Sequence, residues 1–179
     1  MASIANEPFN HRDWIFETKL DGYRTIAVID AAGKARLWSR NHLPLEQKFP
    51  TIGDAVNQLN LRSTILHGEI VALDEEGIPR FQLLQQLQKR PTAPLCFYLF
   101  DLLLCDERDI TGKTVVQRRE RLEGIITPVP GIQVGGYVER HGADLFQLAS
   151  EKGIEGIIEK RKRSTYQPSR PSRIGQNQS

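Results

Sequence analysis

The chain has 179 residues, of which 39% are hydrophobic and 26% are charged, and its formal net charge is +2. This composition is typical of one soluble globular domain with a substantial core, and so small a charge does not identify a polyanionic partner. No apolar run has the length of a membrane span and no signal-peptide pattern opens the chain, so we expect a cytoplasmic protein without a membrane partner. Cys96 and Cys105 lack a Cys-x-x-Cys spacing or a histidine partner, which argues against a zinc site or a disulfide framework.

The first half of the chain predicts strands interrupted by two helical segments. Ile52, Val56 and Leu59 recur at helical spacing, and Gly33 marks a turn between two strand-like runs. Pro91 ends the second helical segment. In chain order the expected elements are strands at 14–16, 25–29, 34–39 and 65–73, and helices at 49–60 and 81–89.

The second half mixes strands and helices without regular alternation. A continuous apolar run, broken only by Asp101, suits a central strand, and Gly153 marks the end of a helix. The pattern favours an α+β domain built on antiparallel sheets flanked by helices. The expected elements are strands at 95–104, 132–139 and 154–160, and helices at 114–126 and 143–152.

The carboxyl end differs in composition from the rest of the chain. Serines and prolines beyond residue 163 argue for loop, so we divide the chain into a domain at 1–163 and a basic, flexible tail at 164–179. Such an end could contact phosphates or could simply be a solvated basic segment. From residue 160 onward there is no acidic residue, and the cations are Lys160, Arg161, Lys162, Arg163, Arg170 and Arg173.

The run from Glu17 to Arg24 contains a lysine where a nucleophile could stand. Asp21 and Gly22 mark a turn between two strand-like segments, and Lys19 lies just before it. A lysine amine is nucleophilic only when deprotonated, and burial or a cation such as Arg24 can lower its pKa from about 10.4. The alternative is a surface lysine on a β-hairpin.

Glu69 and Glu155 share a similar setting, because each lies within an apolar, strand-like run. A buried carboxylate is costly unless it is paired or bound to a cation. Two carboxylates beside Lys19 could hold a divalent metal and a ribose, which would make a nucleotide site. Strand alternation that turns both carboxylates into solvent is the alternative.

Five ordered segments together resemble the nucleotidyltransferase domain of ATP-dependent DNA ligases, and most closely the ligase domain of bacterial end-joining DNA ligases. The resemblance spans residues 14–173. It implies an α+β nucleotidyltransferase fold, the ATP-grasp-like adenylation domain of DNA ligases. The segments are Lys19-Leu20-Asp21-Gly22-Tyr23-Arg24, Ser39-Arg40-Asn41, Gly68-Glu69-Ile70-Val71, Tyr98-Leu99-Phe100-Asp101-Leu102, and Glu155-Gly156-Ile157-Ile158 followed by Lys160.

The resemblance implies that Lys19 attacks the α-phosphate of ATP, releases pyrophosphate and carries AMP, which is then used to seal nicked or broken duplex DNA. Glu69 and Glu155 would hold Mg²⁺ or Mn²⁺, and Phe100 would stack on adenine. Contacts to DNA phosphates would come from Arg40, Arg170 and Arg173. The nucleotide-binding set that the resemblance implies is Glu17, Arg24, Arg40, Glu69, Phe100, Glu155 and Lys160.

The sequence departs from the family pattern in three places. His67 stands where Asp is usual, Ser169 stands where Gly is usual, and neither the Trp-x-Lys segment nor an oligonucleotide-binding (OB-fold) module follows Arg173. We therefore expect slow adenylation and weak sealing unless an end-joining partner or an OB-fold module in trans supplies the missing parts. The alternatives are a non-catalytic remnant that binds ATP or DNA, and an RNA ligase or capping-type nucleotidyltransferase.

Overall fold

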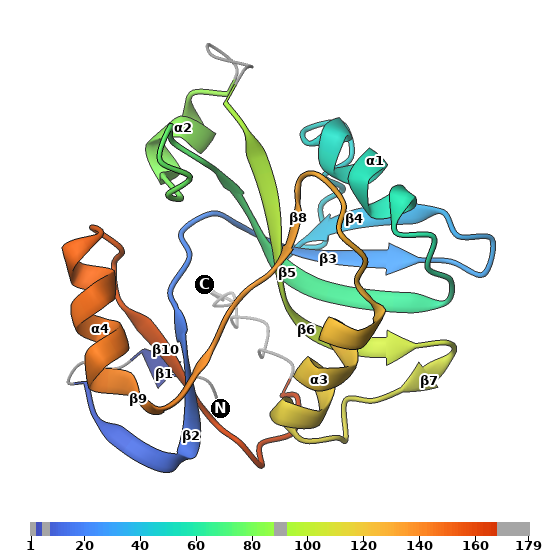
Figure 1. The fold of residues 1–179 in the computed structure, drawn as a ribbon. Helices are drawn as coiled ribbons and strands as arrows, with labels where there is room; N and C mark the ends of the chain where they lie inside the picture. The colour runs from blue at the N-terminus through green and yellow to red at the C-terminus, as the bar shows by residue number, and fades with distance from the viewer. Residues whose placement is uncertain (1–2, 5–7, 88–92, 168–179) are drawn as a thin grey trace, which may run out of the picture.

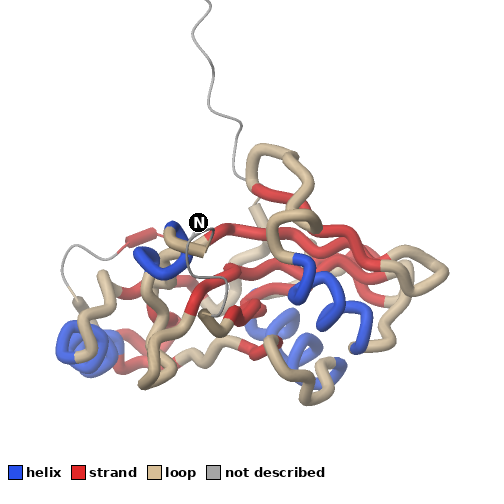
Figure 2. The backbone as a smooth tube through the Cα atoms, turned by 90° about the horizontal axis from the view of Figure 1, so that it is seen from above, coloured by secondary structure: helices blue, strands red, loops and turns tan. Residues whose placement is uncertain are grey.

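The computed structural model describes residues 3–4, 8–87 and 93–167. Within these residues the strands form two sheets, one of six strands and one of four (Figure 1). In the view turned by 90° the strands run through the middle of the molecule and the helices lie beside them (Figure 2). The sheets and helices form the α+β architecture that the sequence predicted.

Neighbouring strands of the larger sheet are antiparallel, except for the pair of β6 and β8. Its strands run in the order β4-β3-β5-β6-β7, and β8 pairs in parallel with β6. Apolar side chains on these strands, in alternating or continuous runs, form the core of the sheet; Leu66, Ile70 and Leu99 are fully buried. The bounds are β3 Tyr23–Ile29, β4 Ala35–Ser39, β5 Thr64–Ala72, β6 Leu95–Cys105, β7 Arg108–Asp109 and β8 Ile132–Val134.

The smaller sheet is antiparallel, in the order β1-β10-β2-β9, and helix α4 packs against it. Its core is separate from that of the larger sheet and is formed by Phe16, Ala149 and Ile157. The sequence therefore builds two hydrophobic cores, one against each sheet. The bounds are β1 Ser3–Ile4, β2 Asn10–Thr18, β9 Val138–His141, α4 Gly142–Glu151 and β10 Ile157–Arg161.

Three further helices flank the larger sheet. Helix α1 (Pro50–Gln58) places Ile52 and Val56 in the core, as its helical spacing predicted, and α2 (Phe81–Gln85) is one short turn. Helix α3 (Val115–Ile125) begins with a capping box, in which the Thr114 hydroxyl and the Gln117 side chain satisfy each other's backbone N–H groups. None of the helices within the described ranges is long and apolar enough to span a membrane.

Three predicted strands differ from the structure. The strand expected at 14–16 is longer, because β2 runs from Asn10 to Thr18. Residues 132–139 were expected to form one strand, but Gly135 and Gly136 interrupt them, so β8 joins the larger sheet and β9 joins the smaller one. The last strand was expected to begin at residue 154, but it begins at Ile157, because the turn that ends α4 continues through Gly153 at φ +67°. Strands β3 to β6 and helices α1, α3 and α4 lie within two residues of their predicted bounds. Helix α2 ends at Gln85, whereas it was predicted to run to 89; residues 88–89 lie outside the described residues.

Candidate active site

Lys19 lies where the chain passes from one sheet to the other. Strand β2 of the smaller sheet ends at Thr18, and β3 of the larger sheet begins at Tyr23. The Lys19 backbone N–H donates to the carbonyl oxygen of Gly156, at 2.9 Å, which ties the crossing to the start of β10. The hairpin alternative for this lysine is therefore wrong, and the side chain lies at the junction of two sheets.

Gly22 allows this crossing to pass close to β5. A Cβ atom at position 22 would overlap the backbone carbonyl of Ile70 and crowd the Val71 side chain. The glycine is needed here for close approach of two backbones.

Gly22→Ala is expected to destabilise the fold by about 1–3 kcal/mol, since either the crossing or β5 must move. Gly112→Ala is the matched control, because a Cβ there meets nothing within 4 Å. Urea denaturation of both variants checks this, and equal stabilities for the two variants would contradict it.

One small cavity, of about 100 Å³, collects most of the predicted nucleotide-binding residues. Glu17 and Lys160 come from the smaller sheet, whereas Arg24, Glu69 and Phe100 come from the larger one. The cavity therefore lies between the sheets, and its walls carry both charge and an aromatic ring. The other lining residues are Thr18, Leu20, Tyr98, Arg119, Gly135, Gly136 and Ile158.

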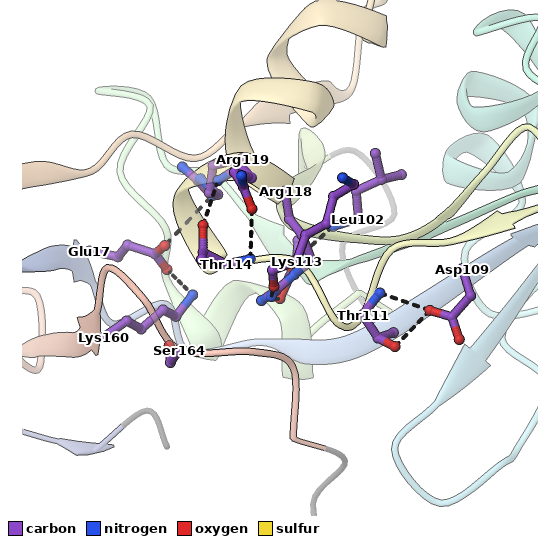
Figure 3. Close-up of polar contacts among 12 residues, drawn as sticks. Glu17, Leu102, Asp109, Thr111, Lys113, Thr114, Arg118, Arg119, Lys160 and Ser164 are labelled. Atoms are coloured by element: carbon purple, nitrogen blue, oxygen red, sulfur yellow. Dashed lines mark hydrogen bonds and ion pairs between the residues drawn. The ribbon is translucent and has the colours of Figure 1, made fainter.

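A buried acid paired with two cations forms one wall of this cavity. The Lys160 ammonium donates to Oε2 of Glu17 at 2.7 Å, and Nη1 of Arg119 lies 3.7 Å from Oε1. Figure 3 shows both cations directed at the same carboxylate. The three side chains are 7%, 12% and 0% exposed for Glu17, Lys160 and Arg119, so the ion pairs are weakly screened by solvent.

Phe100 lies among cations. The guanidinium of Arg24 is 5.4 Å from its ring centre and the Lys160 ammonium is 5.1 Å away. His67 packs against the same ring, with centroids 4.9 Å apart. This arrangement leaves an aromatic surface within a positively charged wall, which suits a base joined to phosphates.

His67 fixes the position of Arg24. The Nε group of Arg24 donates to Nε2 of His67 at 3.0 Å. Burial first, and then the charges of Arg24 and Lys160, lower the pKa of His67 to about 3, so the ring is neutral at physiological pH. Arg24 is thus held by a neutral acceptor at the position where the family usually has a carboxylate.

Glu69 sits on β5 and is largely desolvated. Burial raises the pKa of its carboxyl from 4.5 to about 7, and the Arg24 charge and the Gly22 backbone N–H oppose that shift. The folded state therefore favours the protonated carboxyl. The stability that this preference adds to the folded state is fully present below pH 4.5 and is lost as the pH rises toward 7.

We therefore expect the free energy of unfolding of the wild type, relative to that of Glu69→Gln, to fall between pH 4.5 and 7 by roughly 1–3 kcal/mol without nucleotide or metal. Urea denaturation across this range, in the presence of a chelator, measures the difference. A difference that stays flat or rises with pH would contradict the expectation.

The Lys19 amine lies in a neighbouring cavity of about 200 Å³ and is paired with Oε2 of Glu155. The two cavities share Leu20. Glu155 precedes β10 in an exposed turn and does not lie within an apolar strand as predicted. The structure thus brings Lys19 to one predicted acid and places the other, Glu69, in the adjacent cavity.

Among the described residues, Arg40 is the predicted residue that lines neither cavity. Arg40 is exposed in the loop after β4, whose tight turn is held by hydrogen bonds between Ser39 and Leu43. Arg170 and Arg173 lie outside the described residues. Sequence reasoning missed Arg119. The available signal was its spacing from Val115 and Leu122, which places an arginine on the apolar face of α3.

Comparison with known proteins identifies the family of this chain. The family described as ATP dependent DNA ligase domain matches residues 2–174. The multifunctional non-homologous end joining protein LigD of Pseudomonas aeruginosa is 33% identical over 173 residues, which cover 95% of this chain and 20% of that protein. The SPbeta prophage-derived DNA ligase-like protein LigB of Bacillus subtilis is 29% identical over 90% of this chain and 59% of its own length.

Solved structures agree. The ligase domain of Mycobacterium tuberculosis LigD is 33% identical, with a TM-score of 0.77 over 90% of this chain and 52% of that one. A mycobacterial DNA ligase D complexed with ATP and MES is 30% identical, with a TM-score of 0.78 over 94% of this chain and 55% of that one. The fold is thus that of a DNA ligase nucleotidyltransferase domain. The chain belongs to the ATP-dependent DNA ligase family.

Proposed function

We propose that this chain carries out the adenylation step of an ATP-dependent DNA ligase and passes AMP to DNA. The observation that carries the proposal is the placement of Lys19 at the sheet junction, next to a cavity lined by two aromatic rings, two acids and three cations. Membership in the family supports the reaction type. The chain spans about a fifth of the length of the LigD relatives, so the activity of the whole protein is part of this proposal.

In the proposed reaction the unprotonated Lys19 amine attacks the α-phosphorus of ATP. A nitrogen–phosphorus bond forms, the bond from the α-phosphorus to the bridging oxygen breaks, pyrophosphate leaves with that oxygen, and the attacking nitrogen releases one proton to solvent. Arg24 and Lys160 supply positive charge to the transferring phosphoryl group, because both line the cavity and each is held by a hydrogen bond, Arg24 to His67 and Lys160 to Glu17. Phe100 provides a face for adenine.

The pairing of Lys19 with Glu155 fits the resting enzyme. The Lys19 side chain must leave Glu155 and turn toward the α-phosphate before it can attack. The Glu155 side chain is exposed in the loop between α4 and β10, so it can turn toward solvent while Ile154 and Gly156 on either side of it stay in place. Glu155 thus pairs with Lys19 before ATP binds and releases it when the phosphates enter the site.

A divalent cation, Mg²⁺ or Mn²⁺, is proposed as the cofactor. The described ranges contain no cluster of three or more acids, histidines or cysteines that could hold a metal alone. Mg²⁺ is usually bound by one or two carboxylates together with substrate phosphates, and Glu69 and Glu155 fit that limited role. The buried Glu69 carboxyl supports this choice, since a cation beside it would favour its ionised form. The cation would offset charge on the phosphates.

Nicked or broken duplex DNA is the proposed acceptor of AMP, with an end-joining protein or an OB-fold module as partner. Arg40 is the proposed contact to a DNA phosphate, because it is exposed in a turn held by Ser39. The proposed contacts from Arg170 and Arg173 rest on the sequence alone.

The experiment is incubation of the purified chain with α-labelled or γ-labelled ATP and Mg²⁺. Only the α-label should remain on denatured protein, and added pyrophosphate should remove it, because the step is reversible. Nicked duplex with a 5′-phosphate should then take the label from the protein, whereas a nick with a 5′-hydroxyl should not. Reversible ATP binding without any covalent label would refute the proposed function.

A further inference from the structure

Arg119 on α3 is fully buried, yet its guanidinium is not fully paired. Its Nη2 group donates to the carbonyl oxygen of Gly135. Its Nε and Nη1 atoms have no hydrogen-bond partner among the described residues, and Nη1 is 3.7 Å from Glu17, beyond hydrogen-bond distance. Buried donors without an acceptor are costly and rare in folded proteins, so we expect a ligand or water to pair with these two nitrogen atoms.

Glu17 has the complementary deficiency. Its Oε2 atom accepts from Lys160, whereas Oε1 is buried and accepts no hydrogen bond within the described part of the chain. Glu17 and Arg119 both line the nucleotide cavity, together with Phe100 and Tyr98. One wall of this cavity therefore carries buried donors and a buried acceptor that form an ion pair but have no hydrogen-bond partners, next to aromatic rings.

We infer that Arg119 binds adenine directly, by donating to the ring nitrogen beside the amino group, N1 or N7, while Glu17 accepts from the amino group. A guanidinium only donates and a carboxylate only accepts, and adenine carries its N6 amino group between two acceptor nitrogens. Guanine has a carbonyl oxygen at that position, which would face the Glu17 carboxylate and repel it. This inference rests on the proposed function, because it requires that the cavity holds ATP.

The same arginine also fixes one edge of the cavity. Its bond to Gly135 is matched by the Gly135 N–H, which donates to the carbonyl of Leu99 on β6 at 2.8 Å. Residues 135–137 join β8 to β9 and so connect the two sheets. The Arg119 guanidinium also lies 5.2 Å from the Tyr137 ring. A lysine in its place would keep the charge but could not serve Gly135, Glu17 and a base together.

The test measures equilibrium binding of ATP, 1-deaza-ATP and 7-deaza-ATP by calorimetry, to the wild type, Arg119→Lys and Arg121→Lys. Arg121 is the matched control, because it lies on the same helix but is exposed and paired with Asp106. The wild type and Arg121→Lys should bind one deaza analogue at least about tenfold more weakly than ATP, because a buried donor loses its acceptor. Arg119→Lys should bind ATP and that analogue with equal affinity.

The outcomes separate this inference from the proposed function. If the wild type binds ATP and both deaza analogues equally, water rather than the base satisfies Arg119, and the inference is wrong while the proposed function stands. Discrimination that persists in Arg119→Lys also overturns it. A wild type that binds no ATP would refute both. If Arg119→Lys does not fold, as judged by circular dichroism, the affinities of the wild type for the three ligands still decide the question.

Discussion

Lys19→Ala is expected to lose at least about 10⁴-fold in the rate of covalent AMP attachment, because the variant has no nucleophile for the α-phosphorus. Lys19→Arg should lose as much, although it keeps the positive charge beside Glu155, since a guanidinium does not deprotonate in proteins. The pair of variants thus distinguishes nucleophilic attack from simple charge attraction. Autoradiography after incubation with α-labelled ATP and Mg²⁺ gives the rates.

The control for this prediction is Lys34→Ala, which removes an exposed lysine from the turn between β3 and β4. Its labelling rate should match that of the wild type. Circular dichroism must show that all three variants are folded, so that a lost label reports chemistry. Appreciable labelling of Lys19→Arg would show that another residue carries the AMP.

Arg118→Met is expected to destabilise the protein by about 3–5 kcal/mol, since it leaves the Asp101 carboxylate buried without its partner. Arg118 donates to both carboxylate oxygens of Asp101, at 2.7 and 2.9 Å, and to the Lys113 carbonyl at 2.7 Å. The two charged side chains are only 3% and 8% exposed, so water cannot replace the lost bonds. This pair joins α3 to the centre of the larger sheet.

Arg121→Met is the comparison for this prediction, because Arg121 lies on the same helix and pairs with Asp106 at 3.3 Å in a mostly exposed setting. It should cost less than about 1 kcal/mol. Thermal melts should therefore differ by roughly 4–20 °C between the two variants. The double variant Asp101→Leu/Arg118→Met should recover part of the loss, because no unpaired charge remains. Equal melting temperatures for Arg118→Met and Arg121→Met would contradict the argument.

Local patterns predicted the elements of this fold better than they predicted its connections. Apolar alternation and helical spacing placed β3 to β6 and three helices within two residues, because burial of a strand or helix face depends on nearby residues. The same reasoning treated residues 132–139 as one strand. It could not show that Gly135 and Gly136 separate two strands in different sheets, since strand pairing is decided by contacts far apart in sequence.

The site shows the same limit. The family resemblance identified residues that the structure gathers in one cavity, such as Arg24, Glu69 and Lys160. Asp101 looked like an interruption of an apolar strand, and only the fold pairs it with Arg118 on a helix 17 positions away. Arg119 was overlooked, because its burial depends on α3 packing against β6.

The most direct test of the account is to map the AMP by mass spectrometry on wild-type protein digested after incubation with ATP and Mg²⁺. The account predicts a single modified peptide that contains Lys19, with AMP joined through an acid-labile nitrogen–phosphorus bond. AMP found on any other side chain, or its absence from a protein that binds ATP, would contradict it.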